Sequence, residues 1–331
     1  MCAGTPTSVL ILLLALAVLA VPRTADSQRL AKLARIGLLE AVSASNYAKE
    51  REALIAGLRE LGYAEGKNVI VEYRWAEGNY ERLPSLAAEL VEMKVDVIVA
   101  GGYQAISAAQ QATKTIPIVM VRTSDPVAAR FVASIARPER NITGLSNINV
   151  DVMTKYLELL RAAIPKLSRV SVLVNPGHPS HPGFLNRIRA TEKPNRVTVS
   201  PARASTWGQI EAAFDAMTRS RAGALIVLPD SFFYAHGRKI AALAAQHRLP
   251  TMFGTRDPVE SGGLMSYGQN ITEHYHRAAT YIDKILKGAN PGNLPVEQPT
   301  KLELVINLKT AKSIGLTIPQ SLLLRADQII Q

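Results

Sequence analysis

Short apolar runs in this chain end abruptly in polar residues whose spacing could bind a ligand. In TIPIVMVRTSDP, residues 115–126, an apolar stretch is followed by Thr123, Ser124 and Asp125. Hydroxyl and carboxylate oxygens accept hydrogen bonds, and a carboxylate also attracts an ammonium group. This spacing indicates recognition of a small molecule with a polar head.

The same pattern recurs at residues 41–46, 101–104, 175–178 and 229–233. In parallel sheets, ligands bind beyond the carboxyl ends of the strands, where helix N-termini present unpaired N–H groups. Because these loops come from both halves of the chain, we expect them to face one shared cleft. The candidate ligand-binding residues are Ser43, Ser45, Gly102, Tyr103, Gln104, Ser124, Asp125, Asn147, Asn175, Asp230, Phe232 and Tyr267.

An amino-acid ligand would divide these residues by role. The serine hydroxyls and the helix N-terminal amides would hold its carboxylate, and Asp125 or Asp230 would meet its ammonium group. Three aromatic residues could stack on an aromatic side chain, a contact worth about 0.5–1.5 kcal/mol beyond burial. These are Tyr103, Phe232 and Tyr267.

Each of these features also has a purely structural interpretation. Ser, Asn and Asp at strand-to-helix junctions commonly cap the helix and touch nothing else. Gly101-Gly102 fits a tight turn as well as a close approach of the backbone to a ligand. The aromatic residues could pack in the core.

Catalytic motifs are absent from the sequence. It contains no G-x-S-x-G elbow, no glycine-rich phosphate loop, no G-x-G-x-x-G and no H-E-x-x-H. His178 and His181 share one loop, but Cys2 is the only cysteine and there are six histidines, so we expect neither a metal site nor a cofactor. An exported or cytoplasmic Rossmann-like enzyme remains one alternative to a solute-capturing protein, and a ligand-sensing binding protein is another.

The N-terminus has the pattern of an export signal. Residues Val9–Val21 are thirteen consecutive apolar residues, too few for a spanning helix, and Ala25-Asp26-Ser27 offers small residues for cleavage. We expect a signal peptide at 1–27, a mature start at Gln28 and a periplasmic location. The first eight residues carry no Lys or Arg, so a misassigned start or a short membrane anchor stays open as an alternative.

The composition is that of a globular protein. With 47% hydrophobic and 20% charged residues, it fits neither a disordered chain nor a multi-span membrane protein. The net charge of +11 is scattered without a long basic run, which predicts a solvated surface and no nucleic-acid partner. A two-lobed regulator would also need a DNA-binding module before the first strand.

Strand and helix patterns alternate along the chain, which predicts an α/β fold with parallel sheets covered on both faces. The first lobe is predicted to contain strands at 34–39, 68–72, 95–100 and 118–121, and helices at 47–61, 84–93, 103–113 and 126–135. The second is predicted to contain strands at 169–174, 196–199, 224–228 and 251–253, and helices at 151–164, from Thr206, and at 234–247. A strand at 263–267, a helix at 271–287 and a strand at 302–306 follow.

Five long segments resemble the substrate-binding proteins of ABC transporters, in the family that includes the binding components of bacterial tryptophan and tyrosine importers. They are GLRELGYAEGKNVIVEYRWAEGNYERLPSLAAELV (57–91), ATKTIPIVMV (112–121), NITGLSN (141–147), GGLMSYGQN (262–270) and LPVEQPTKLELVINLKTAKSIGLTIPQSLLLRADQII (294–330). The resemblance covers nearly all of the mature chain. It departs at residues 175–196, where four prolines shorten the usual long helix.

The resemblance implies a type I periplasmic binding protein, with two Rossmann-like lobes joined by crossover hinge strands. It further implies a small ligand, often an amino acid, trapped by hinge closure, with an ABC permease and an ATPase as partners, no direct membrane contact and a monomeric state. The N-terminal lobe would span 28–147, completed by about 270–300, and the C-terminal lobe 148–269. A crossover strand and helices would follow at 300–331, with hinges at 147–149 and 268–270 and a linker at 291–299.

Overall fold

The computed structural model describes residues 33–147, 152–298 and 301–331. The expected signal peptide, the alternative membrane anchor and part of the 147–149 hinge lie outside these ranges. Within them, no helix combines the length and apolar character that crossing a membrane requires.

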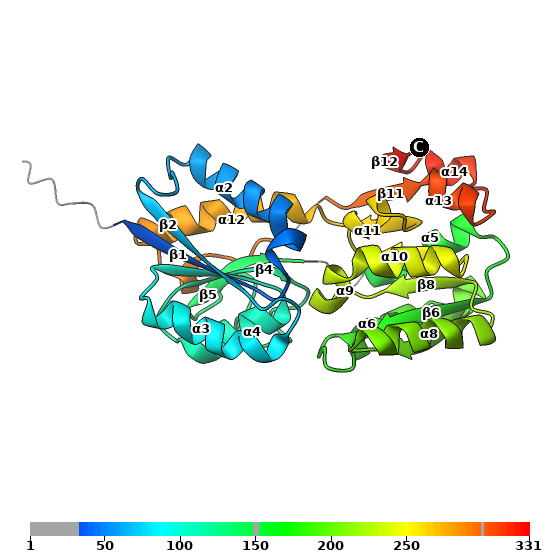
Figure 1. Ribbon diagram of the computed structural model, residues 1–331, viewed down its shortest axis with the longest axis horizontal. Helices are drawn as coiled ribbons and strands as arrows, with labels where there is room; N and C mark the ends of the chain where they lie inside the picture. The colour runs from blue at the N-terminus through cyan, green and yellow to red at the C-terminus, as the bar shows by residue number, and fades with distance from the viewer. Residues whose placement is uncertain (1–32, 148–151, 299–300) are drawn as a thin grey trace, which may run out of the picture. The chain divides into compact units, whose positions relative to one another are not determined.

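The first sheet has five parallel strands in the order β2-β1-β3-β4-β5 (Figure 1). Their bounds are β1 Ala34–Glu40, β2 Val69–Trp75, β3 Val97–Gly101, β4 Ile118–Thr123 and β5 Ile142–Ser146. Strands β3, β4 and β5 are buried along their whole length, as expected for a parallel sheet covered on both faces. All five carboxyl ends therefore lie at one edge.

Two pairs of helices cover this sheet. Helices α2 (Ala48–Glu60) and α12 (Ile271–Leu286) lie side by side on one face, and α3 (Leu83–Glu92) and α4 (Tyr103–Ala112) cover the other (Figure 1). Leu54 and Leu58 are one helical turn apart on α2 and pack into the same core as Tyr275 and Ile282 of α12. The chain thus returns from the second lobe to complete the first. Short 3-10 turns lie at Ala44–Tyr47 and Tyr80–Arg82.

The second sheet has seven strands in the order β12-β11-β10-β9-β8-β6-β7. Their bounds are β6 Arg169–Val174, β7 Thr198–Arg203, β8 Ala224–Val227, β9 Thr251–Phe253, β10 Met265–Gly268, β11 Glu303–Asn307 and β12 Gln328–Ile330. All neighbours are parallel except β10 and β11. The antiparallel pair departs from the all-parallel prediction, because β11 enters the sheet from the first lobe and runs the opposite way.

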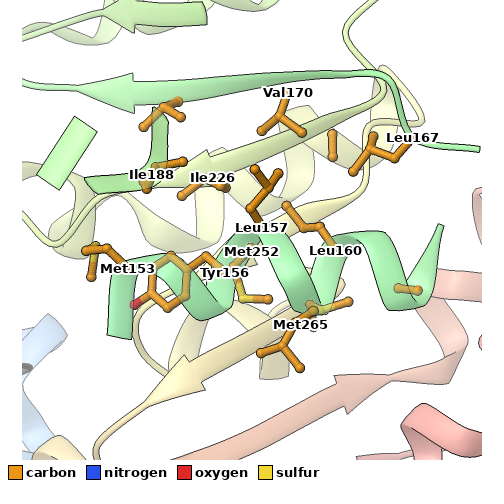
Figure 2. Packing of buried hydrophobic residues seen from close by; sticks show 14 of the residues in the cluster. Met153, Tyr156, Leu157, Leu160, Leu167, Val170, Ile188, Ile226, Met252 and Met265 are labelled. Carbon is orange, nitrogen blue, oxygen red and sulfur yellow. The ribbon is translucent and has the colours of Figure 1, made fainter. Parts of the chain in front are cut away.

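Helices cover both faces of the second sheet. In Figure 2, Leu157 and Leu160 of α5 point towards the sheet residues Val170 and Ile226. The helices are α5 Val152–Ala163, α6 His181–Ala190, α7 Glu192–Asn195, α8 Trp207–Arg219, α9 Ser231–Ala235, α10 Gly237–Gln246, α11 Asp257–Glu260, α13 Leu308–Ser313 and α14 Gln320–Leu323. Helix α6 has only ten residues, in line with the shortening that the prolines predict.

The chain passes between the two sheets three times: after β5, after β10 and before β11. The last passage follows the 3-10 turn Pro291–Asn293 and borders β5, where Glu297 forms a parallel bridge with Leu145. Two lobes built on mostly parallel sheets and joined by three passages form the predicted α/β architecture, so this fold class is confirmed.

Two helix predictions are wrong. Residues 126–135 form turns instead of a helix, because Arg130 adopts a left-handed φ of 59° and Phe131 donates to the carbonyl of Pro126. The predicted helix at 234–247 is two helices, α9 and α10, separated at His236, and α9 starts three residues earlier than expected.

An irregularity between β4 and β5 shapes the edge that faces the second lobe. The register shifts between Met120 and Thr123, and Arg122 within it has a left-handed φ of 58°. Opposite this bulge, Gly144 has φ 126°, and a Cβ there would lie 2.3 Å from the carbonyl oxygen of Met120. Such bulges redirect side chains, so Gly144 is needed for the position that Arg122 takes.

The Gly144→Ala variant is expected to lose about 2–4 kcal/mol of unfolding free energy, because the added methyl group meets strand backbone at a strained φ. Gly315→Ala is the matched control: its φ is 76° but nothing lies within 4 Å of the added carbon, so about 1 kcal/mol should be lost. Urea unfolding measures both. Equal losses would contradict the steric role of Gly144.

Candidate ligand-binding site

A pocket lies where loops from both sheets meet. Its lining residues are Gly102, Tyr103, Arg122, Ser124, Asn147, His178, Val227, Leu228, Pro229, Asp230, Ser231, Phe233, Tyr234, Phe253, Gly254, Thr255, Pro258, Gln269 and Ile271. Most follow the carboxyl ends of β3, β4, β8, β9 and β10, the edge at which parallel sheets bind ligands. The cavity volume is about 60 Å³, whereas an engineered protein cavity that binds benzene measures about 150 Å³.

The first-lobe wall begins with Gly102, the N-cap of α4. Its φ is 83°, and a Cβ would lie 2.4 Å from Oγ of Ser231 in the second lobe. No side chain caps α4, so the amides of its first turn stay open to an acceptor. The glycine thus permits both a close approach of the lobes and an uncapped helix end at the pocket.

Arg122 contributes a buried charge to the same wall. Its Nη2 donates to Oε2 of Glu40 at 2.6 Å and its Nε donates to the Tyr275 hydroxyl at 3.0 Å. The hydroxyl of Tyr275 donates in turn to Oε1 of Glu40 at 2.5 Å. Burial disfavours the charge, but the neighbouring Tyr275 and Glu40 oxygens raise the pKa of Arg122 well above its ordinary value. Its charge is therefore neutralised within the protein.

The second-lobe wall is centred on Asp230, the N-cap of α9. Its Oδ1 accepts from the backbone N–H groups of Phe232 and Phe233, and its Oδ2 accepts from Nδ2 of Asn175 at 3.0 Å. Burial raises the pKa of Asp230, while these hydrogen bonds oppose the shift. Asp230 lines the pocket, but most of its hydrogen-bonding capacity organises the loop.

His178, which lines the pocket, stacks on His181 with ring centroids 4.3 Å apart. His181 accepts from the backbone N–H of Asn175 through Nδ1, so Nε2 carries the proton and donates to the carbonyl of Pro229. Burial lowers the pKa of His181 to about 4. Burial, with a contribution from His181, lowers the pKa of His178 to about 3. Both rings are neutral at physiological pH.

These histidines and Asp230 have ligand atoms within 4.8 Å of one another, a spacing that could hold a metal ion. However, both ring nitrogens of His181 bond to the backbone, and a metal would have to break one of these bonds. The geometry is that of a histidine anchoring its own loop.

Tyr234 joins the second-lobe wall to the first lobe. Its hydroxyl donates to Oε1 of Glu50 on α2 at 2.5 Å, and its ring lies 4.9 Å from the guanidinium carbon of Arg122. Nearby, Lys49 pairs with Glu260 at 2.9 Å and Asn46 donates to the carbonyl of Ala235. The two walls therefore touch directly in this structure.

Five of the twelve predicted site residues line this pocket: Gly102, Tyr103, Ser124, Asn147 and Asp230. The structure places two others directly behind it. Asn175 bonds to Asp230, and Gln104 follows Tyr103 in the first turn of α4.

The other five lie away from the pocket. Ser43 and Ser45 bond to each other at 3.0 Å before α2, and Ser45 borders a separate groove. Asp125 accepts from the N–H of Ala128 in a turn. Phe232 packs on His236, and Tyr267 packs against the core around α5.

Sequence reasoning missed eight polar or aromatic lining residues: Arg122, His178, Ser231, Phe233, Tyr234, Phe253, Thr255 and Gln269. Arg122 and His178 lie within the strand-end segments 115–126 and 175–178, so the strand-end pattern could have included them. Tyr234 was assigned to a longer helix. Gln269 was considered only as part of a hinge.

Two α/β lobes around a shared pocket define the class of two-lobed solute-binding proteins with the type I periplasmic binding protein fold. The chain belongs to the family of ABC transporter substrate binding proteins, whose model matches residues 35–330. The predicted family is thereby confirmed. The chain is a substrate-binding protein of an ABC transporter and not an enzyme.

Individual relatives are similar over most of their length. A tyrosine-binding protein of Clostridioides difficile (strain R20291) is 26% identical over 86% of this chain and 82% of its own. A conserved domain protein of Vibrio cholerae has a TM-score of 0.84 at 28% identity, covering 90% of this chain and 100% of that one. An ABC domain from Streptococcus pneumoniae in complex with L-Trp has a TM-score of 0.83 at 26% identity, covering 90% and 99%.

The buried histidines are expected to contribute a loss of stability as the pH is lowered from about 6.5 towards 4. His178, His181 and His274 have pKa values lowered to about 3, 4 and 4. The folded state keeps them neutral while the unfolded chain takes up protons, so each contributes up to about 1.4 kcal/mol of lost stability per pH unit. Urea unfolding across this pH range measures the slope.

The His178→Gln variant should lose less stability than the native protein over the same pH interval. His276→Gln is the control, because the His276 side chain is 43% exposed. Parallel pH profiles for the native protein and His178→Gln would contradict the buried neutral state of this ring.

Proposed function

We propose that this chain is the periplasmic solute-binding subunit of an ABC importer, which captures an amino acid, most suitably an aromatic one, between its lobes and delivers it to the permease. The observation that carries the proposal is the pocket at the carboxyl edges of both sheets, lined by polar and aromatic groups from both lobes. Two relatives support the ligand class, since one is named a tyrosine-binding protein and another was solved with L-Trp.

The chemistry of the lining agrees with such a ligand. Aromatic rings reach the pocket from both sides, with Tyr103 in the first lobe and Phe233, Tyr234 and Phe253 in the second. The ring centroid of Tyr103 lies 5.5 Å from that of His178 in the second lobe, so these two rings touch in this structure. Rings arranged on two walls can stack on an aromatic side chain placed between them.

The size of the pocket supports hinge motion. At about 60 Å³ it has no room for an aromatic amino acid, so the lobes or the lining side chains must move apart to admit one. The contacts of Tyr234 and Lys49 across the lobes would then break and re-form. A ligand shifts this equilibrium by the difference between its affinities for the two states.

The lobe boundaries, the partners and the location belong to the same proposal. The N-terminal lobe comprises 28–147 completed by about 270–300, the C-terminal lobe comprises 148–269, and 300–331 forms a crossover strand and helices. An N-terminal signal directs export, and a monomer presents both lobes to the permease and its ATPase. The matching family model supports the transporter partners.

A thermal-shift screen of residues 28–331 tests the ligand class. A ligand at about 100 times its Kd adds about 2.7 kcal/mol of stability. We expect L-tryptophan or L-tyrosine to raise the melting temperature, and glucose and myo-inositol to leave it unchanged. A shift with a sugar and none with either amino acid would overturn the aromatic amino-acid proposal.

Removing the Tyr234 hydroxyl tests whether its hydrogen bond between the lobes stabilises the closed, ligand-bound state. Tyr234→Phe leaves Glu50, which is 2% exposed, without its partner across the lobes. The separated state should gain population, and the affinity for the amino acid should fall about 10-fold, the value of one hydrogen bond to a charged group. Calorimetric titration and small-angle X-ray scattering measure the two effects.

Tyr63→Phe is the matched control, since Tyr63 also donates to a carboxylate, Oδ1 of Asp283 on α12, but within the first lobe. It should leave both the affinity and the radius of gyration unchanged. Equal effects of the two variants would contradict a specific role of Tyr234 between the lobes.

A further inference from the structure

We propose that Gln269 and Asn147, which lie where the chain passes between the lobes, recognise the head group of a zwitterionic ligand. This inference rests on the proposed function and assigns the part of the ligand that these two residues bind. The α-carboxylate and α-ammonium groups of an amino acid have the chemistry that fits them.

Gln269 places a buried amide on the pocket wall. It is 3% exposed and lines the pocket directly after β10. Neither its Nε2 nor its Oε1 has a hydrogen-bond partner among the described residues. Most buried polar side chains in native proteins are hydrogen-bonded, and leaving one unpaired is unfavourable. An unpaired amide on a pocket wall is therefore best explained by a partner that arrives with the ligand.

Asn147 repeats this feature on the neighbouring passage. It directly follows β5, lines the same pocket and is 7% exposed. Its backbone N–H donates to the carbonyl of Thr123, which fixes its main chain, but its Oδ1 has no partner among the described residues. Among the described residues, the amide of Gln269 and the amide oxygen of Asn147 are thus unpaired polar groups from distant parts of the sequence that line one pocket.

The donors and acceptors match an amino-acid head group. A primary amide offers N–H donors on one atom and an acceptor on the other. Nε2 of Gln269 can donate to the ligand carboxylate while its Oε1 accepts from the adjacent ammonium, and Oδ1 of Asn147 can accept a second ammonium N–H. The uncapped first turn of α4 at Gly102 adds backbone donors for the carboxylate.

The charges around the pocket favour a zwitterion over an anion. Arg122, the only arginine or lysine in the lining, is already paired with Glu40. His178 is neutral, and Asp230 is the only acidic residue in the lining. A ligand with a bare negative charge would find no unpaired cation here, whereas a carboxylate with its own ammonium beside it needs none.

The position of these amides also links binding to lobe movement. Gln269 lies between β10 of the second sheet and α12, which covers the first sheet, and Asn147 lies between β5 and α5. A head group that bonds to both residues contacts two of the three passages. Binding would thus act directly on the segments that must bend when the lobes move.

The Gln269→Leu variant tests the assignment, because leucine keeps a comparable volume but removes both hydrogen-bonding atoms. Calorimetric titration should show the affinity for L-tryptophan and L-tyrosine falling about 10- to 100-fold, the loss expected for hydrogen bonds to charged groups. The affinity for indole, which has no head group, should not change. Gln246→Leu, at the exposed end of α10, is the control and should bind as the native protein does.

The Gln269→Glu variant provides a second test, in which the preference among ligands with different head groups should change. The acid keeps the acceptors but loses the donor and repels a carboxylate, so the preference for L-tryptophan over tryptamine should shrink or reverse. Indole-3-propionate, which lacks the ammonium, should lose the most affinity. Unchanged ratios between the affinities for these three ligands would overturn the head-group assignment.

The ligand-free variants separate this role from a structural one. Because the Gln269 amide has no partner in the described part of the chain, Gln269→Leu should melt at or above the temperature of the native protein. A lower melting temperature with an equal loss of affinity for L-tryptophan and indole would show that Gln269 only supports the fold.

If the native protein binds neither amino acid, the proposed ligand class fails and this assignment with it. If it binds them and Gln269→Leu binds equally well, only this assignment fails.

Discussion

The buried ion pair between Glu40 and Arg122 holds together the edge of the first sheet that faces the pocket. Glu40 ends β1, Arg122 stands in the bulge of β4, and Tyr275 of α12 closes the network from a segment that has returned from the second lobe. Such a pair is costly to bury, and removing one partner leaves an uncompensated charge. Three distant segments must therefore be in place together before the pocket wall exists.

This network also determines what the pocket can bind. The guanidinium of Arg122 is hydrogen-bonded to Glu40 and to Tyr275. Because the Glu40 carboxylate balances its charge, the pocket wall presents no free positive charge to a ligand. Tyr234 lies over that cation and reaches Glu50 of the first lobe, so the groups that shape the pocket are also the groups through which the lobes touch. Recognition and lobe contact depend on one set of buried polar residues.

The sequence predicts the architecture well, because parallel strands and amphipathic helices have local patterns. It predicts the five lining residues that sit at strand ends or at a lobe passage, since the sheet topology alone brings those positions together. The sequence does not predict which side chains reach the pocket when that depends on how distant segments pack together. Asp125 and Asp230 look alike in sequence, yet one closes a turn and the other reaches the pocket. The contact of Tyr234 with a residue 184 positions away, and the unpaired amide of Gln269, appear only in three dimensions.

A crystal structure of the protein with bound L-tryptophan or L-tyrosine tests the central claim most directly. The account predicts a widened pocket in which the aromatic ring lies among the rings of both walls, while Nη2 of Arg122 stays bonded to Glu40. A complex in which Arg122 has left Glu40 to pair with the ligand carboxylate would contradict the account. In that case Arg122 would bind the ligand directly instead of holding the pocket wall together with Glu40.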